Sequence, residues 1–136
     1  MQLSSTLRQI EVPLARVAIF VVYFWFGALK LAGVSPAGEL VHQLLGVMIP
    51  LFPFAAFYTG LALFEMLIGL LALFKGMEKI TLLFIVLHLI STVLPLILLP
   101  SLTWQSFFVP TLEGQYIIKN ILILAAAVTI GARRFH

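Results

Sequence analysis

The stretch Gly60-Leu61-Ala62-Leu63-Phe64-Glu65-Met66-Leu67-Ile68-Gly69 places one carboxylate near the centre of an apolar run that extends from Phe54 to Phe74. Such a run matches the ~20 residues with which a helix crosses ~30 Å of hydrocarbon. A charge at that depth costs at least ~2.5 kcal/mol, so it must face protein or water instead of lipid. We therefore expect Glu65 to be buried in a helical bundle, where it meets a partner.

The composition is that of an integral membrane protein. Of the 136 residues, 62% are hydrophobic and 10% are charged, whereas soluble domains carry about 25% charged residues. The net charge of +3 comes from dispersed basic residues, which membrane topology explains better than nucleic-acid binding. No cysteine is present, so disulfides and thiolate metal sites are excluded. The chain is expected to form a single membrane domain over residues 1–136.

The apolar runs predict an all-α, four-helix membrane bundle. Its spans are expected at about 13–31, 54–74, 80–99 and 116–132, with Pro13 at the start of the first. A short helix, Ala37 to Val47, lies between the first two spans; at 11 residues it is too short to cross and is expected to lie in the interface. Residues 100–115 are expected to form a loop, with Trp104 as an aromatic-belt anchor.

The distribution of basic residues predicts the orientation. They flank both chain ends and fill the turn between the second and third spans, at Arg8, Arg16, Lys75, Lys79, Arg133 and Arg134. Positive residues favour the cytoplasmic side, so both termini and this turn are expected there, with the two longer loops outside. Met1 to Val12 lacks the pattern of a signal peptide, so the first span is expected to be retained.

The other polar residues of the spans define a candidate site. At ~1.5 Å per residue, Glu65, His88 and Tyr23 lie near the midplane, and Lys30 and Lys119 lie roughly 8 to 12 Å further out. A lysine side chain reaches about 6 Å, so both amines are expected to approach the carboxylate. These five residues are the predicted ligand-binding set, and the outer half of the bundle is expected to hold a cation-rich pocket with a carboxylate floor.

The same charges have a structural interpretation. In it, an ion pair of Glu65 with Lys30 or Lys119 only locks the helices together, and interhelical polar contacts of this kind contribute a modest ~0.6 kcal/mol in membranes. Arg16, from the inner part of the first span, is also assigned to a structural ion pair with Glu65. In the functional interpretation the charges hold a ligand head group or relay protons, and His88 favours this because histidine exchanges a proton near neutral pH. A lone Glu with a lone His does not indicate a metal site, and His42 is interpreted as a surface residue.

Several motifs together resemble the DoxX family of small bacterial membrane proteins. They are Leu14-Ala15-Arg16, Phe26-Gly27-Ala28-Leu29-Lys30-Leu31, Glu65-x-x-x-Gly69 and Lys119-Asn120-Ile121-Leu122-Ile123-Leu124. The related hypochlorite-resistance inner-membrane proteins are the alternative. The DoxX resemblance implies the bacterial inner membrane, and it implies either the membrane subunit of a thiosulfate:quinone oxidoreductase or an association with oxidoreductases that defend against oxidants. It places Arg16, Lys30, Glu65 and Lys119 at the family's recurring polar positions.

Three functions are compatible with these residues. The first is a quinone-interacting or redox-associated membrane subunit, with quinone as the possible cofactor and an oxidoreductase as the possible partner; an apolar slot with hydrogen-bond donors from Tyr23, His88 and the lysines would suit quinone carbonyls. The second is a binding or transport protein for a small lipophilic or anionic solute. With four spans and no repeat, transport would require a homo-oligomer. The third is a non-catalytic membrane scaffold for a partner enzyme.

Overall fold

The computed structural model describes the backbone of residues 2–135 and the side chains of residues 2–132. Within that range, four helical runs are long and apolar enough to cross a membrane: α1 (Gln2–Leu31), α3 (Phe54–Ala72), α4 (Glu78–Leu98) and the run Leu112–Ala132. The last of these contains α6 (Leu112–Lys119) and α7 (Ile121–Phe135). The predicted arrangement of four long helices is thus observed. The side chains of Arg133 and Arg134, used above for the orientation, lie outside the described residues.

The first helix is longer than predicted. It begins at Gln2, and Pro13 lies inside it. The missing N–H of Pro13 deprives the Gln9 carbonyl of its usual partner, but helical turns on both sides keep their hydrogen bonds. The composition of the sequence indicates only where the apolar run begins, at Pro13. The helix itself begins eleven residues earlier, at Gln2.

Most of residues 100–115 lie in regular secondary structure, so the predicted loop was wrong. They form α5 (Pro100–Thr103), the antiparallel strands β1 (Trp104–Ser106) and β2 (Val109–Pro110), and the start of α6. Phe108 has a positive φ of 59° in the connection between the strands. The Trp104 indole N–H donates to the Leu96 carbonyl at 3.0 Å, and Thr111 caps α6 by accepting from the Gly114 N–H. Side-chain bonds to the backbone thus order a segment without a helical or strand pattern of its own.

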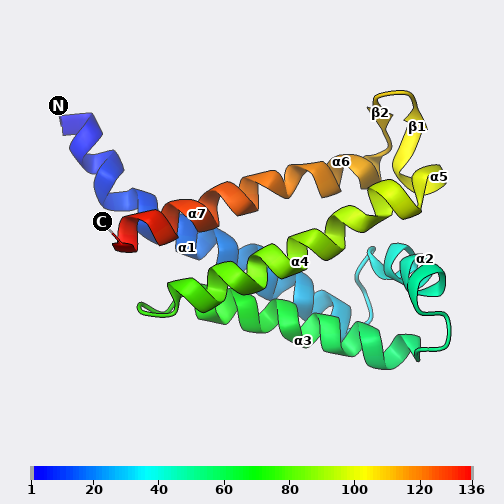
Figure 1. The fold of residues 1–136 in the computed structure, drawn as a ribbon. Helices are drawn as coiled ribbons and strands as arrows, with labels where there is room; N and C mark the ends of the chain where they lie inside the picture. The colour runs from blue at the N-terminus through cyan, green and yellow to red at the C-terminus, as the bar shows by residue number, and fades with distance from the viewer. Residues whose placement is uncertain (1, 136) are drawn as a thin grey trace.

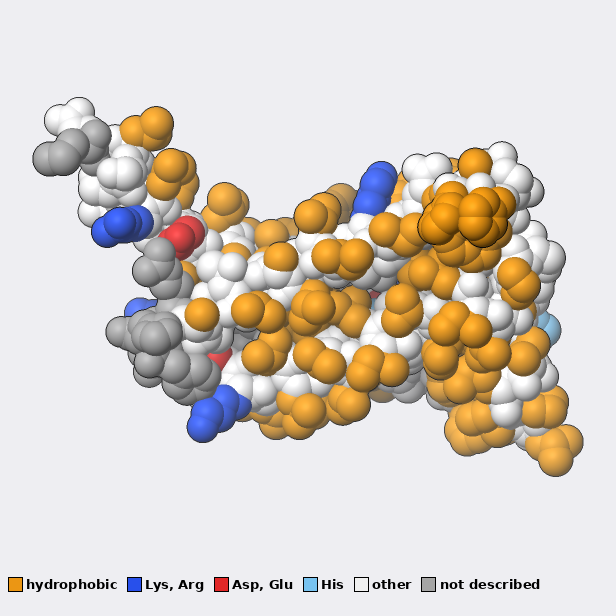
Figure 2. All heavy atoms as spheres, turned by 45° about the horizontal axis from the view of Figure 1, so that its top comes forward, with side chains coloured by type: hydrophobic (Ala, Val, Ile, Leu, Met, Phe, Trp, Pro, Cys, Tyr) orange, Lys and Arg blue, Asp and Glu red, His pale blue; other side chains and the backbone are white. Residues whose placement is uncertain are grey.

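Both termini lie at one end of the bundle, together with the turn between α3 and α4 (Figure 1). The opposite end carries α2 (Gly38–Met48), α5 and the hairpin. The bounds of α2 agree with the predicted short helix to within one residue at each end. Charged side chains gather at the end with the termini, while hydrophobic side chains cover much of the visible flank (Figure 2). This distribution is the one expected of a bundle surrounded by lipid.

Glycine allows α1 and α3 to pack closely. A Cβ at Gly27 would lie 2.7 Å from the Ala62 carbonyl oxygen, and one at Gly69 would lie 2.9 Å from the Phe24 nitrogen. Ala62, Glu65 and Gly69 lie on the face that α3 buries. The hydrophobic core consists of Ile19, Tyr23, Ile68, Ala72, Ile85, Ala127 and Ile130. Close packing of two backbones brings the polar side chains of both helices within reach of each other.

Candidate functional site

A buried polar network links α1, α3 and α4. The Lys30 ammonium donates a hydrogen bond to Glu65 Oε1 at 3.0 Å, and the two side chains are only 9% and 6% exposed. His88 Nε2 lies 3.7 Å from the same oxygen, too far for a direct hydrogen bond. On its other side, His88 Nδ1 is 3.0 Å from the Tyr23 hydroxyl. The structure therefore brings together four of the five predicted ligand-binding residues.

The local sequence explains this convergence. Tyr23 and Lys30 are seven residues apart and share a face of α1. Gly27 lies between them on that face and lets α3 approach, so that Lys30 reaches Glu65. His88 lies on the buried face of α4. Small residues set the helix spacing, and the polar residues beside them fill the space that results.

Lys119 does not join the network, so the expectation that its amine approaches Glu65 was wrong, while a ligand-binding role for Lys119 stays a prediction. Its side chain is exposed, and its ammonium lies 5.4 Å from the centre of the Tyr116 ring. The helix turns at Asn120 between α6 and α7, and it is Asn120 that faces α4, donating to the Thr92 hydroxyl at 3.4 Å. The depth of Lys119 along the span was predictable. Its direction was not, because the face that α6 buries carries Gly114 and Ile117, and Lys119 does not share that face.

Arg16 is also not a partner of Glu65, and the predicted ion pair between them was wrong. Arg16 Nη2 lies 2.7 Å from Glu78 Oε1, and Nη1 donates to the Ala72 carbonyl at 2.9 Å. Arg16 is 14 residues from Lys30, which corresponds to about 21 Å along a helix. Glu78 begins α4 at the same end of the bundle as Arg16. Its place in the charged turn before the third span was the signal for this pairing.

An apolar layer separates these two charged groups. Ile19, Ile68 and Ile85 are at most 2% exposed and pack together in the core. In sequence they lie between the network around Glu65 and the Arg16–Glu78 pair on each of the three helices. The polar side chains of the described residues therefore do not form a continuous path along the bundle.

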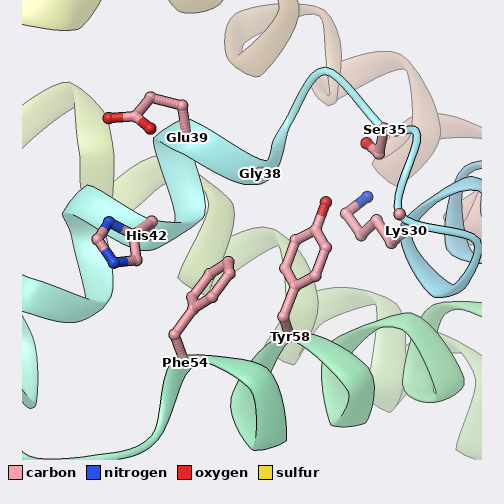
Figure 3. Close-up of a pocket in the computed structure, with 8 residues that line it drawn as sticks. Lys30, Ser35, Gly38, Glu39, His42, Phe54 and Tyr58 are labelled. Atoms are coloured by element: carbon pink, nitrogen blue, oxygen red, sulfur yellow. The ribbon is translucent and has the colours of Figure 1, made fainter.

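A cavity of about 500 Å³ opens at the end covered by α2. It is lined by Lys30, Gly33, Ser35, Gly38, Glu39, His42, Phe54 and Tyr58. Figure 3 shows Tyr58 and Lys30 directed toward the same part of the cavity, with Glu39 and His42 coming from α2. Lys30 belongs both to the cavity wall and to the buried network. It is therefore the link through which a molecule in the cavity would contact the network.

Two buried oxygens have no hydrogen-bond partner within the described part of the chain. They are the Tyr58 hydroxyl and Glu65 Oε2. A buried polar group without a partner costs about 1–3 kcal/mol, so each is a position where a ligand group or water would be stabilised. Tyr58 and His42 are residues of this region that the predicted site did not include. The signal for Tyr58 was its position seven residues before Glu65, on the same helix face.

Comparisons of the chain with protein-family models, curated proteins and solved structures give no match. Within residues 2–132, no group of three His, Cys, Asp or Glu side chains is arranged to hold a metal ion. The geometry of the cavity and of the Lys30–Glu65 network thus provides the basis for a functional argument.

Proposed function

We propose that this chain is a multi-pass protein of a bacterial inner membrane, related to DoxX, that binds the headgroup of an isoprenoid quinone in the cavity beneath α2. The observation that carries the proposal is the position of Lys30. Its ammonium is held by Glu65 at 3.0 Å, while the same side chain lines a cavity beside the unpartnered hydroxyl of Tyr58. Two hydrogen-bond donors thus line one cavity of about 500 Å³, in which Phe54 supplies an apolar wall.

This arrangement suits a quinone for chemical reasons. A quinone presents carbonyl oxygens, which accept hydrogen bonds, and Lys30 retains donors beyond the one that Glu65 uses. Tyr58 supplies a second donor, and Phe54 supplies an aromatic wall. Reduction of a quinone to a quinol takes up two electrons and two protons. The electrons would come from an oxidoreductase partner, and the role of this chain is to hold the headgroup where protons can reach it.

The apolar layer below the network favours binding over transport. Ile19, Ile68 and Ile85 close the bundle on the side away from the cavity. The alternative of an anionic solute relied on two lysines at the site, and only Lys30 is present there, because Lys119 is exposed elsewhere. We therefore place the site in a redox-associated membrane subunit. The alternative functions are a solute-binding protein and a scaffold that binds no ligand.

The substitution Tyr58→Phe tests quinone binding. Because the hydroxyl has no partner within the described residues, its removal should leave the unfolding temperature of the empty protein unchanged or slightly raised. Binding of a short-chain quinone analogue, measured as a ligand-induced increase in unfolding temperature, should weaken by about five- to tenfold, equivalent to the ~1 kcal/mol of one hydrogen bond. Tyr116→Phe, an exposed tyrosine on α6, is the matched control and should bind normally.

The ligand class is tested on the protein purified from its own membranes. An organic extract analysed by mass spectrometry should contain quinone in proportion to the protein, and less of it from Tyr58→Phe. A quinone-free extract, together with an unfolding temperature that ignores quinone analogues, would overturn the proposal. A shift with small anions alone would instead favour the solute-binding protein.

Orientation is tested with single cysteines, since the chain contains none. Lys75→Cys, in the turn between α3 and α4, should react with a membrane-impermeant maleimide only after the cells are opened. Phe107→Cys, in the hairpin, should react in intact spheroplasts, because we place this end of the bundle outside the cytoplasm. The reverse pattern would contradict the orientation.

A further inference from the structure

The two donors that face the cavity are themselves covered by protein. The Tyr58 hydroxyl is buried and has no hydrogen-bond partner within the described residues. The Lys30 side chain is only 9% exposed. A ligand can therefore contact both donors only after the part of the chain that covers them has moved.

The first turn of α2 covers the Tyr58 hydroxyl. Gly38, the first residue of α2, lies so close that a Cβ added to it would be 3.5 Å from the hydroxyl oxygen. Figure 3 shows Tyr58 pointing toward this start of α2. The turn shields the hydroxyl from water, yet the hydroxyl finds no partner among the described residues. Because a buried polar group without a partner costs free energy, the closed position of this turn carries a penalty.

Few contacts hold α2 in place. Within the described part of the chain, no side chain of α2 bonds to another helix, and Gln43 donates only to Glu39 in α2 itself. His42 makes an edge contact with Phe54, at 4.9 Å between the ring centres. Of the residues of α2, all of which are described, only Leu45 is buried. An element with so few buried contacts is among the first to open locally.

The anchor of α2 and its covering turn lie at different ends of the helix. Leu45 comes seven residues after Gly38, which corresponds to about 10 Å along a helix. The helices α1 and α3 are instead held together by close backbone contact at Gly27 and Gly69, so their separation does not provide access to the site. The first turn of α2 is the part of the cavity wall that can lift while Leu45 stays in place.

We propose that α2 is a lid that pivots at Leu45 and closes over the ligand, a control of access that rests on the proposed quinone site. In the open position, water reaches the Tyr58 hydroxyl. In the closed position, a carbonyl oxygen of the headgroup supplies the partner that the hydroxyl lacks. A ligand stabilises the conformation that it binds better, so a bound headgroup favours the closed lid. Opening is required for both entry and release.

Distances between spin labels test the lid in the protein without ligand, and the chain has no cysteine of its own to interfere. One label pair, Glu39→Cys with Thr59→Cys, joins the covering turn to an exposed position on α3. The matched control pair, Val47→Cys with Thr59→Cys, joins the other end of α2 to the same position. We expect a second, longer distance in the first pair only. A single distance in both pairs, or equal lengthening in both, would overturn the proposal.

The substitution Tyr58→Phe tests why the lid opens, because it removes the unpartnered hydroxyl and keeps the ring. In the first label pair, the population with the longer distance should fall about fivefold, which is the equivalent of one hydrogen bond. Tyr116→Phe, at an exposed tyrosine, is the control and should leave this population unchanged. The same population in Tyr58→Phe as in the parent protein would contradict the penalty on the closed lid.

A short-chain quinone analogue separates this inference from the proposed function. Added to the first label pair, it should remove the longer distance. If the analogue has no effect on the distances or on the unfolding temperature while Tyr58→Phe still closes the lid, the quinone site is wrong and the lid is supported. If the analogue raises the unfolding temperature but the longer distance persists, the lid is wrong and the quinone site is supported.

Discussion

The Lys30 ammonium and Glu65 Oε1 lie 3.0 Å apart, but the two residues differ in what surrounds them. Lys30 lines the open cavity under α2, whereas Glu65 does not and has one oxygen without a partner within the described residues. If its partner is removed, the lysine can turn toward the cavity and find water. The Glu65 carboxylate does not line the cavity and cannot reach water in this way.

This difference predicts unequal costs for breaking the pair. Lys30→Met leaves a buried carboxylate unpaired and should lower the free energy of unfolding by about 3–5 kcal/mol. Glu65→Gln should cost less, because Lys30 can reorient. Thermal unfolding in detergent measures both. The double variant Lys30→Met/Glu65→Leu should regain much of the loss, since it removes both charges together; equal costs for the two single variants would contradict the asymmetry.

The bond between the Tyr23 hydroxyl and His88 Nδ1 at 3.0 Å predicts an interaction between α1 and α4. Tyr23→Phe should destabilise the protein by about 1–3 kcal/mol, because the ring still fills its space while a buried histidine nitrogen loses its partner. In a double-mutant cycle, Tyr23→Phe should have little further effect once His88 is replaced by Phe. Additive losses would show that the two side chains act independently.

Sequence reasoning predicted the four helical runs because a membrane imposes length and apolarity on each of them. It also predicted that Glu65 would meet Lys30, since both depths follow from the rise per residue. It failed for Lys119, because a depth along the span does not say which face of the helix is buried. It also failed for Arg16, because Glu78, an opposite charge at nearly the same height, was overlooked. The hairpin was missed because Trp104 and Thr111 order it through single bonds to the backbone, which leave no periodic pattern.

Arg16 is predicted to fix the turn between α3 and α4. Its guanidinium donates to the Ala72 carbonyl at the end of α3 and to Glu78 at the start of α4. One side chain of α1 thus contacts both of the helices that the turn connects. Arg16→Met should lower the unfolding free energy by more than ~1.5 kcal/mol, the lower limit for hydrogen bonds to charged groups. Arg16→Lys should recover only part of the loss, because an ammonium lacks the planar fork.

The control for Arg16 is Arg8→Met, on the projecting and exposed end of α1, which should leave the unfolding temperature almost unchanged. Limited proteolysis gives a second measurement. Cleavage after Lys75, in the turn beside this ion pair, should accelerate in Arg16→Met. The same rate in both arginine variants would contradict the assigned role.

Glycines on this chain provide a test of close packing between α1 and α3. Gly27→Ala and Gly69→Ala would each place a Cβ within 3.0 Å of backbone atoms on the facing helix, and backbone cannot move aside as a flexible side chain can. Overpacking of this kind costs about 1–3 kcal/mol. It should also push α3 away from α1 and so weaken the contact between Lys30 and Glu65.

The matched controls are Gly46→Ala and Gly60→Ala, in helices α2 and α3, where a new Cβ meets nothing within 4 Å. Alanine restricts the unfolded chain and suits a helix, so each should raise the free energy of unfolding by about 0.4–1 kcal/mol. The same chemical change is thus expected to have opposite signs at the two pairs of positions. Thermal unfolding of the four variants in one detergent decides this, and a uniform sign would show that helix propensity, not contact between backbones, governs these glycines.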